Sequence, residues 1–433
     1  MPDIYQAPSR FPLDVAGIIY PSARTRIWNY TFRIGFLLRE EADHWRLRRA
    51  LSDLRPRFPS FFVSVRHGLF WYCLERVYGL DIVHKETDYP CRSMDIFSRD
   101  MPAIRVLYDR RRFSLEVSHA VSDAGGALVF AKALLARYLE LGGTEIPPGS
   151  GLPDLDEPPC PGELEDSYRA NYTKEREKPG GNGPAYQYRP PRIRNYLKVV
   201  HGIVPLEDVL PTVKARGLTV TDYLMAVYLY SFYAADPHAR CSRRPIRISV
   251  SISLRGLYQS ESLRNFSLYA NLGFTPHEKE IFTFEDILEA MKGKLAAAKT
   301  KGEMHKLLCS HVALVQNPFV RAVPNAIKRR IMRLGYILAG ETTQTSPLSS
   351  LGQMKLPPCM AEHVEAVEAI LGGSPYKRIQ CAVISDDRRL HLFFSGDTEK
   401  TDVQREFFRL LAREGIHARV ESNIRHREEE TTL

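Results

Sequence analysis

The stretch SHAVSDAGGAL (Ser118–Leu128) decides the fold, because it joins a buried strand to a helix. Apolar residues alternate from 113 to 117, as a half-buried strand requires, and the same period places His119 on the inward face. After the glycines, apolar residues at helical spacing predict a helix over 128–141 that ends at the glycine pair 142–143. A titratable ring is therefore expected at the end of an interior strand.

The residues that follow the histidine suit a tight strand-to-helix connection. Asp123 stands four residues after His119, and a carboxylate at the start of a helix is favoured by the free backbone amides there. Gly125 and Gly126 would let another chain or a substrate approach the backbone closely. The simpler alternative is that Asp123 is only a helix cap and His119 only a core histidine. The glycine-rich turn beside a buried strand favours a chemical role.

Composition limits the classes of protein that this chain can represent. Its 433 residues carry a formal net charge of +9, which suggests anionic partners or merely a basic surface. Seven scattered cysteines without a CxxC pair indicate neither a metal site nor a disulfide framework. No apolar run is long enough for a transmembrane segment, and the N-terminus lacks the apolar core of a signal peptide, so the cytoplasm is the expected location.

The basic clusters do not predict a nucleic-acid partner, because no aromatic residues are interleaved with them as a stacking platform. One of them, KRRIMRLGYIL at 328–338, is both basic and apolar. Such a helix suits either core packing, which we favour, or contact with a membrane surface.

The organisation of the chain follows from a Pro/Gly-rich, charged stretch at 147–191, which reads as a long linker. It separates an N-terminal lobe (1–146) from a C-terminal lobe (192–433). In the second lobe the periodicity predicts helices at 219–233, 285–298 and 325–338 and a strand at 246–254.

The chain also repeats one pattern. The order strand, charged turn, strand, helix near residues 104–143 returns at 379–415, and alignment of the two copies sets His119 opposite Gly396. Either the two lobes arose by duplication, with chemistry in one of them, or the match is a coincidence.

With these features the chain resembles the HxxxD acyltransferase superfamily, whose members include chloramphenicol acetyltransferase and the condensation domains of peptide synthetases. The likeness is greatest to the alcohol acetyltransferase-like branch. The likeness includes SLRNF at 262–266, SPLSSLGQMKLP at 346–357 and the closing HLFFSGD at 391–397. It implies an α/β (α+β) fold of two chloramphenicol acetyltransferase-like lobes, each a mixed sheet flanked by helices, with the active site in a channel between them. It also implies a crossover segment near 341–360.

Three positions depart from the family pattern. Ser118 stands where the family usually has a first histidine, and Ala124 follows the aspartate where a glycine is usual. The crossover segment reads Ser349-Ser350-Leu351-Gly352, with serine in the place of asparagine. Since the second histidine is the catalytic one in the family, we expect activity to survive the first change.

The resemblance implies an acyltransferase that moves an acyl group, expected to be acetyl, from a coenzyme A thioester to a small-molecule hydroxyl or amine. His119 would be the general base, because a neutral imidazole can accept the proton of the nucleophile near neutral pH. The absence of a GxSxG elbow agrees with a reaction that forms no covalent acyl-enzyme. No bound cofactor and no metal are expected.

Other residues are assigned supporting roles by the same resemblance. Asp123 would turn away from the substrate and pair with Arg255, while Gly125 and Gly126 support the loop. The candidate hydrogen-bond donors for the oxyanion are Asn265, Ser349 and Ser350. Two alternatives remain open: a condensation-type enzyme that takes its donor from an acyl carrier protein, and a non-catalytic binding protein on the same scaffold.

Overall fold

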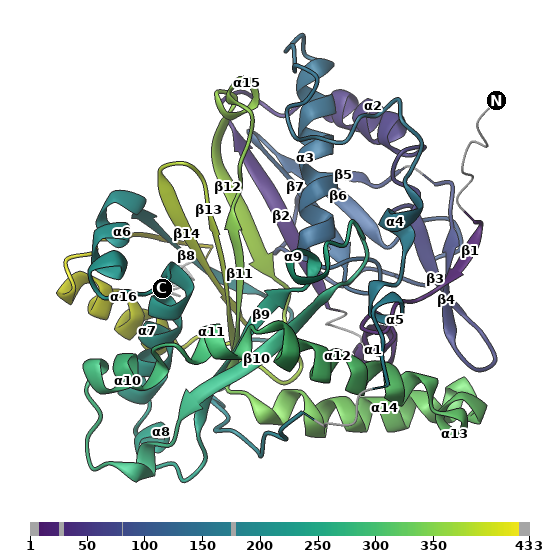
Figure 1. Cartoon of the computed structure of the whole chain (residues 1–433). Coiled ribbons are helices and arrows are strands. Elements are labelled where there is room, and N and C mark those ends of the chain that lie inside the picture. Colours follow the sequence, from purple (N-terminus) through teal and green to yellow (C-terminus); the bar gives the residue numbers. More distant parts are fainter. Residues whose placement is uncertain (1–7, 26–29, 80, 175–178, 424–433) are drawn as a thin grey trace, which may run out of the picture.

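The computed structural model describes residues 8–25, 30–79, 81–174 and 179–423. Of the polar N-terminal segment that predicts the absence of a signal peptide, residues 1–7 lie outside these ranges. The chain forms two lobes, each a mixed sheet flanked by helices, and a small sheet at one side (Figure 1). The small sheet has the order β1 (Arg10–Pro12), β4 (Tyr72–Arg76), β3 (Val63–His67).

The N-terminal sheet has five strands, and its apolar face is covered by two helices. Phe113 and Tyr138 pack with ring centroids 5.5 Å apart, which joins strand β7 to helix α3. Helix α2 in turn packs on α3. In spatial order the sheet contains β12 (Val364–Leu371), β2 (Thr31–Leu38), β7 (Arg112–Ser118), β6 (Ile104–Asp109) and β5 (Val83–Lys85); the helices are α2 (His44–Leu54) and α3 (Ala124–Glu140).

The C-terminal sheet has seven strands. Helices α7 and α16 pack on each other and on this sheet, since Tyr228 of α7 and Phe407 of α16 both contact Phe394 of β14. The N-terminus of α7 is fixed by a capping box between Thr219 and Asp222. In spatial order the sheet contains β10 (Ser267–Phe274), β9 (Ile246–Ser253), β11 (Ser346–Gln353), β13 (Ile379–Ser385), β14 (Arg389–Gly396), β8 (Lys198–Pro205) and β15 (Arg419–Ser422); the helices are α6 (Leu206–Ala215), α7 (Val220–Ala235) and α16 (Asp402–Arg413).

Five strands of the two sheets have the same pairing pattern. In the first lobe β5 and β6 are parallel, and the successive pairs β6–β7, β7–β2 and β2–β12 are antiparallel. In the second lobe β11 and β13 are parallel, and β13–β14, β14–β8 and β8–β15 are antiparallel. In each lobe a helix also follows a strand (β2 then α2, and β8 then α6), and a helix follows a hairpin (β6 and β7 then α3, and β13 and β14 then α16). The repeat expected from the sequence is therefore a repeat of topology, which favours duplication over coincidence.

One strand crosses between the lobes. The segment expected to cross over, near 341–360, contains β11, which lies inside the C-terminal sheet. The strand that joins the N-terminal sheet is β12, at Val364–Leu371, and it pairs with β2 over its length. The boundaries 1–146 and 192–433 therefore divide the chain in sequence, but the C-terminal half contributes one strand, β12, to the N-terminal sheet.

The remaining elements are mostly short helices. The helix expected at 285–298 is divided into two, because Gly293 adopts a φ of +73° between them. In the described part of the long linker the helices are α4 and α5, and a two-bond ion pair between Arg57 and Glu163 ties it to the first lobe. These elements are α1 (Ile19–Ala23), α4 (Pro161–Leu164), α5 (Ser167–Ala170), α8 (Pro237–Arg240), α9 (Arg255–Tyr258), α10 (Phe284–Met291), α11 (Lys294–Ala298), α12 (Lys301–Gln316), α13 (Pro318–Ala322), α14 (Asn325–Ala339), α15 (Pro358–Ala361) and the 3₁₀ turns Pro276–Glu278 and Glu341–Thr343.

The helices α12, α13 and α14 lie at the lower right of the molecule in Figure 1, and α1 packs against α14. Within the described ranges, no helix combines the length and the apolar character needed to cross a bilayer.

Candidate functional site

His119 lies directly after β7, where the chain leaves the N-terminal sheet. Its backbone amide donates to the carbonyl of Tyr30 at 2.9 Å, which fixes the exit of the strand. The imidazole stacks on Tyr20 of α1 at a centroid distance of 5.0 Å and leans on Phe32 of β2 at 4.5 Å. The ring is half-buried, and its Nδ1 atom is buried without a hydrogen-bond partner in the described part of the chain. The accessible edge of the ring is therefore the one that carries Nε2.

The surroundings keep this imidazole neutral. Burial lowers the pKa of His119 to about 4, although the nearby Asp123 carboxylate acts in the opposite direction. Desolvation prevails because the aromatic neighbours offer the cation no replacement for water. At neutral pH the ring thus retains a free lone pair, which is the form that a general base requires.

Asp123 points away from the accessible edge of the imidazole and into a network with the other lobe. Its two carboxylate oxygens lie 2.8 and 3.0 Å from the guanidinium of Arg255. The amides of Phe266 and Gly126 donate to it at 2.8 and 3.1 Å, the second as a helix N-cap. Burial tends to raise the pKa of Asp123, but Arg255 and these donors hold it below its usual value.

The structure accounts for both glycines after Asp123. A Cβ atom on Gly126 would lie 2.0 Å from the carbonyl oxygen of Leu263, and one on Gly125 would lie 2.6 Å from a guanidinium nitrogen of Arg255. The hydroxyl of Ser122 also donates to the carbonyl of Leu263 at 2.6 Å. The close approach anticipated from the sequence is thus made by a segment of the C-terminal lobe.

Asn265 holds the backbone of His119 in place through its side-chain amide. Its side-chain amide donates to the backbone carbonyl of His119 and to the carboxylate of Asp14, both at 3.0 Å. Asp14 also accepts from the amide of Gly17 at 2.6 Å and is completely buried. Since both amide hydrogens of Asn265 are engaged, the structure places it as a support of the His119 loop rather than as a free donor for an oxyanion.

The two candidate serines lie on opposite faces of β11, as neighbouring strand residues must. Ser350 hydrogen-bonds Thr221 of α7 at 3.1 Å, so it faces the helix-covered side of the sheet. Ser349 accepts from Ser251 at 3.3 Å, and Ser251 is paired with Tyr269 on the same face. Only Ser349 therefore remains a candidate oxyanion donor.

Ser118, at the position where the resemblance leads us to expect a first histidine, is completely buried, and its hydroxyl accepts from the amide of Ala120 at 3.3 Å. Its side chain points to the opposite side of β7 from His119, because the two are neighbours at the end of the strand. The serine therefore belongs to the packing of the loop.

The sequence reasoning missed the aromatic chain beside the histidine. Tyr20 contacts Tyr30 at 5.5 Å between centroids, and Tyr30 contacts Tyr336 of α14 at 5.8 Å. The hydroxyl of Tyr336 donates to Glu341 at 2.6 Å. Asp14 and Tyr20 were missed as well, because they lie about a hundred positions from the motif and no local pattern connects them.

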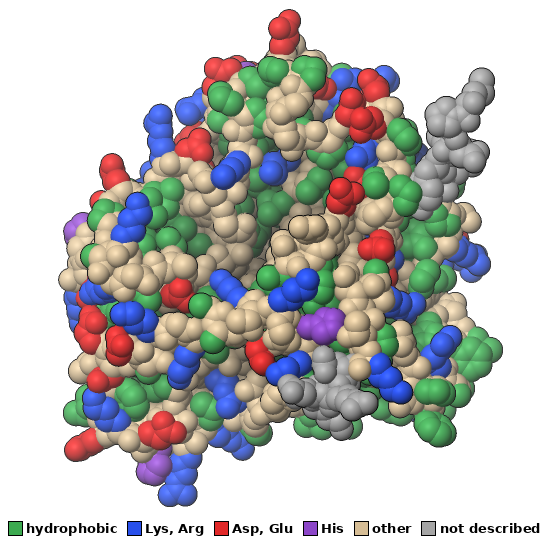
Figure 2. Space-filling view, in the orientation of Figure 1, with side chains coloured by type: hydrophobic (Ala, Val, Ile, Leu, Met, Phe, Trp, Pro, Cys, Tyr) green, Lys and Arg blue, Asp and Glu red, His purple; other side chains and the backbone are tan. Residues whose placement is uncertain are grey.

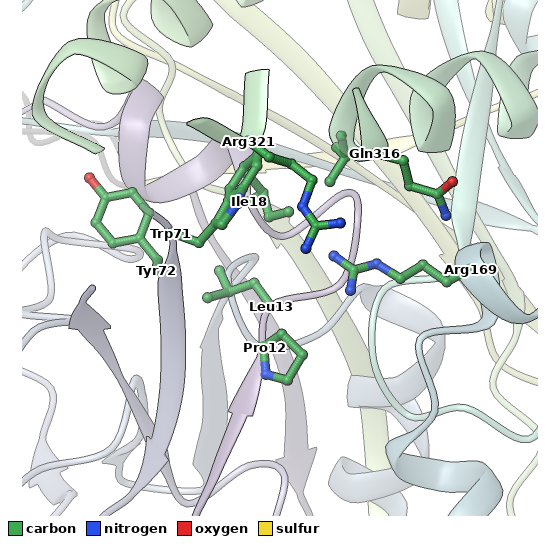
Figure 3. Close-up of a pocket in the computed structure, with 9 residues that line it drawn as sticks. Pro12, Leu13, Ile18, Trp71, Tyr72, Arg169, Gln316 and Arg321 are labelled. Atoms are coloured by element: carbon green, nitrogen blue, oxygen red, sulfur yellow. The ribbon is translucent and has the colours of Figure 1, made fainter. Parts of the chain in front are cut away.

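A pocket of about 450 Å³ is lined in part by the N-terminal segment that supports this site (Figure 3). Its lining includes Leu13 and Ile18, on either side of Asp14 in sequence, and it also contains Trp71, Arg169 and Arg321. None of the site residues expected from the sequence lines this pocket. On another face, Figure 2 shows the molecule hollowed between α3 and the strands β11 and β12, where the lobes meet.

Comparison with solved structures identifies the architecture. The nonribosomal peptide synthetase FmoA3 matches over 95% of this chain with a TM-score of 0.58 and 17% identity. TRI101 of F. sporotrichioides, solved with coenzyme A and T-2, matches over 95% of this chain and 99% of its own (TM-score 0.61, 10% identity). The trichothecene 15-O-acetyltransferase TRI3 of Fusarium sporotrichioides matches over 94% and 96% (TM-score 0.54, 13% identity).

The fold is that of two chloramphenicol acetyltransferase-like lobes. The fold expected from the sequence is thus confirmed. This chain spans 42% of the length of FmoA3 but nearly the whole of the two Fusarium proteins. No protein-family model and no curated protein sequence matches the chain. At these identities the likeness establishes architecture alone.

Proposed function

We propose that this chain is an acyltransferase that moves an acyl group from a coenzyme A thioester to a hydroxyl or amine, with His119 as its general base. The observation that carries the proposal is a half-buried imidazole, neutral at pH 7, at the junction of two lobes and held there by contacts from both. Such a ring has an accessible nitrogen and a defined direction, and among the residues that the structure describes it has no salt-bridge partner.

In this mechanism Nε2 of His119 accepts the proton of the acceptor hydroxyl or amine as the heteroatom attacks the thioester carbonyl carbon. The carbonyl oxygen becomes an oxyanion, for which the hydroxyl of Ser349 is the candidate donor. When the tetrahedral intermediate collapses, the carbon–sulfur bond breaks and the imidazolium returns its proton to the departing thiolate. No acyl group is ever attached to the protein.

Asp123 has a structural role in this proposal. Its carboxylate is fully engaged by Arg255 and two backbone amides, so no oxygen is left to orient the imidazole or to meet a substrate. It holds the start of α3 against the loop before β10, and this fixes the position from which His119 projects. Asn265, held by Asp14, fixes the backbone of His119 through a hydrogen bond to its carbonyl.

Two comparisons support the choice of donor. TRI101 was solved with coenzyme A, and TRI3 is named as an O-acetyltransferase, so the fold accommodates coenzyme A and acetyl transfer in those proteins. The likeness to a nonribosomal peptide synthetase favours a second candidate, in which the donor is an acyl group carried on a carrier protein. The two candidates share the role of His119 and differ only in what delivers the thioester.

The proposal is tested by following free thiol released from acyl-CoA in the presence of a panel of alcohols and amines. The His119→Ala variant should lose about 10²–10⁴-fold in rate, the usual contribution of a positioned base, with an unchanged circular dichroism spectrum. His84→Ala, at an exposed position of β5, is the matched control and should retain full activity.

Turnover by His119→Ala at the wild-type rate would overturn the assignment of the base. A parallel assay with an acyl carrier protein loaded with the same acyl group separates the donors: turnover with the carrier alone would favour the second candidate. Binding of acceptors without any thiol release from either donor would instead favour a non-catalytic protein.

A further inference from the structure

The outer side of α14 carries a stripe of large apolar side chains. Ile327, Ile331, Leu334 and Leu338 recur at intervals of four, three and four residues, which places them on one side of the helix. Their exposed fractions are 54, 60, 57 and 60%. Isolated exposed apolar residues are common on protein surfaces, but a continuous stripe of four indicates a surface that contacts something else.

Neighbouring segments extend this stripe. Leu69, in the turn between β3 and β4, is 75% exposed, and Phe319 of α13 is 84% exposed. The turn is held against the start of α14, because Asn325 donates its amide to the carbonyl of Leu69 and the ammonium of Lys328 donates to that of Phe70, both at 2.8 Å. Figure 2 shows hydrophobic side chains gathered at the lower right, over α13. We call Leu69, Phe319 and the four residues of the stripe the α14 face.

The charged residues of α14 itself all have one sign. The sequence of α14 contains Lys328, Arg329, Arg330 and Arg333 and no acidic residue. The three arginines are exposed; by helical spacing Arg330 adjoins the apolar stripe, and Arg333 lies one step further round the same flank. Apolar side chains flanked by arginines match a bilayer that exposes anionic headgroups, with the arginines at headgroup level.

A pocket beside the α14 face suits a phosphate group. In Figure 3 the guanidinium groups of Arg321 and Arg169 extend into the same cavity of about 450 Å³, next to Trp71. Within the described residues Arg169 pairs with Asp166 at 3.2 Å through Nε, which leaves the terminal nitrogens of its guanidinium toward the cavity. The ring of Trp71 has the ammonium of Lys328 at 3.4 Å from its centroid, so this pocket adjoins the start of α14.

We propose that the α14 face docks the protein on a membrane surface that contains anionic lipids. Two other occupants fit less well. A second copy of the chain, related by a two-fold axis, would bring the arginines of both copies together. An acidic carrier protein would match the arginines, but it would leave most of the apolar residues, which lie on three separate segments, without a partner.

The docked helix would also lie next to the chemistry. The inner side of α14 presents Tyr336, which contacts Tyr30, and the chain of rings continues through Tyr20 to His119 with centroid distances of 5.8, 5.5 and 5.0 Å. A membrane on the outer side is then about one helix diameter, ~10 Å, from this cluster. A lipophilic acceptor could therefore enter along α14; this step rests on the proposed function, whereas the docking itself does not.

The test is sedimentation of the full chain with vesicles of phosphatidylcholine alone and of equal parts phosphatidylcholine and phosphatidylglycerol. Wild-type protein should sediment with the anionic vesicles only, and less so as salt is raised. Ile331→Asp combined with Leu334→Asp should weaken binding at least about tenfold. Arg330→Glu combined with Arg333→Glu should weaken it about fivefold or more for each arginine.

Matched controls separate this surface from the rest of the molecule. Ile281→Asp, at a position 67% exposed before α10, and Arg243→Glu, at an exposed position after α8, should bind as wild type. His119→Ala should also bind as wild type, so failure of the catalytic proposal and failure of docking are distinguishable. Circular dichroism verifies that each variant is folded.

Four results would overturn the docking proposal. The first is wild-type protein that stays in the supernatant with anionic vesicles, and the second is binding that the aspartate variant leaves unchanged. The third is a wild-type dimer, seen by sedimentation velocity, that the aspartate variant converts to monomer; it would assign the α14 face to a second copy. Capture of a loaded acyl carrier protein that depends on Arg330 and Arg333, without vesicle binding, would assign it to that partner.

Discussion

The contact between Asp123 and Arg255 gives the sharpest prediction on stability, because it joins the motif to the other lobe. Asp123 is 4% exposed, and the side chain of Arg255 is 18% exposed, so both charges are largely removed from water. Removing one partner of a buried pair costs about 3–5 kcal/mol, since the other charge is left without compensation. Asp123→Ala also removes the N-cap of α3, which contributes about 1 kcal/mol on its own.

Because these contributions overlap, we expect Asp123→Ala to lower the free energy of unfolding by about 4 kcal/mol. That is a large part of the 5–15 kcal/mol typical of a folded protein. Asp123→Asn keeps the cap and loses only the charge, so it should lose about half as much. Combining Asp123→Ala with Arg255→Ala should cost less than the sum of the single changes, by about 2 kcal/mol, because no orphan charge remains.

The assay is urea unfolding at pH 7, followed by circular dichroism. The control is Asp88→Ala, which breaks the exposed ion pair with Arg92 at 3.0 Å and should change stability by less than about 1 kcal/mol. If Asp123→Ala unfolds at the wild-type urea concentration but releases no thiol, the carboxylate acts on the chemistry and not on the fold. That result would refute our structural assignment of Asp123.

Two further predictions concern the base and the glycines. Burial lowers the pKa of His119 to about 4, and falling pH inactivates a base by protonating it. The acid limb of the pH profile of kcat/KM should therefore have an apparent pKa below about 6.5, the ordinary value of a free imidazole. An apparent pKa at or above about 6.5 would contradict the buried environment of His119. Gly126→Ala should destabilise the protein by about 1–3 kcal/mol in urea unfolding, because the new Cβ would meet the carbonyl of Leu263. The control Gly256→Ala, with no atom within 4 Å of its Cβ, should not destabilise it. Equal effects of the two changes would show that the close approach is unimportant.

Local patterns predicted the elements on which the motif stands. Two-residue alternation identified β7, and helical spacing with an acidic cap identified α3, because each depends on neighbours in sequence. For the ion pair between Asp123 and Arg255, 132 positions apart, the family resemblance supplied the pairing of the aspartate with an arginine, and the alternation of the strand at 246–254 supplied Arg255 as the candidate. The single helix expected at 285–298 was wrong because Lys292 and Gly293 interrupt an otherwise helical pattern.

Long-range contacts account for what the sequence could not predict. The amide of Asn265 looked like a free donor, and only the three-dimensional structure shows that Asp14 and the His119 carbonyl occupy it. Ser349 and Ser350 looked equivalent until the pairing of β11 placed them on opposite faces. The exposed stripe on α14 has the same periodicity as a buried one, so its surface position required knowledge of what packs on each side.

The exchange of β12 has a consequence for how the molecule is made. While a nascent chain is being synthesised, β2, β7 and β6 emerge early, but the strand that completes their sheet arrives only after residue 371 has left the ribosome. Until then β2 has an open edge that another chain could pair with. A fragment that ends at the linker would keep that open edge permanently, so we expect neither half of this protein to be stable when it is produced without the other.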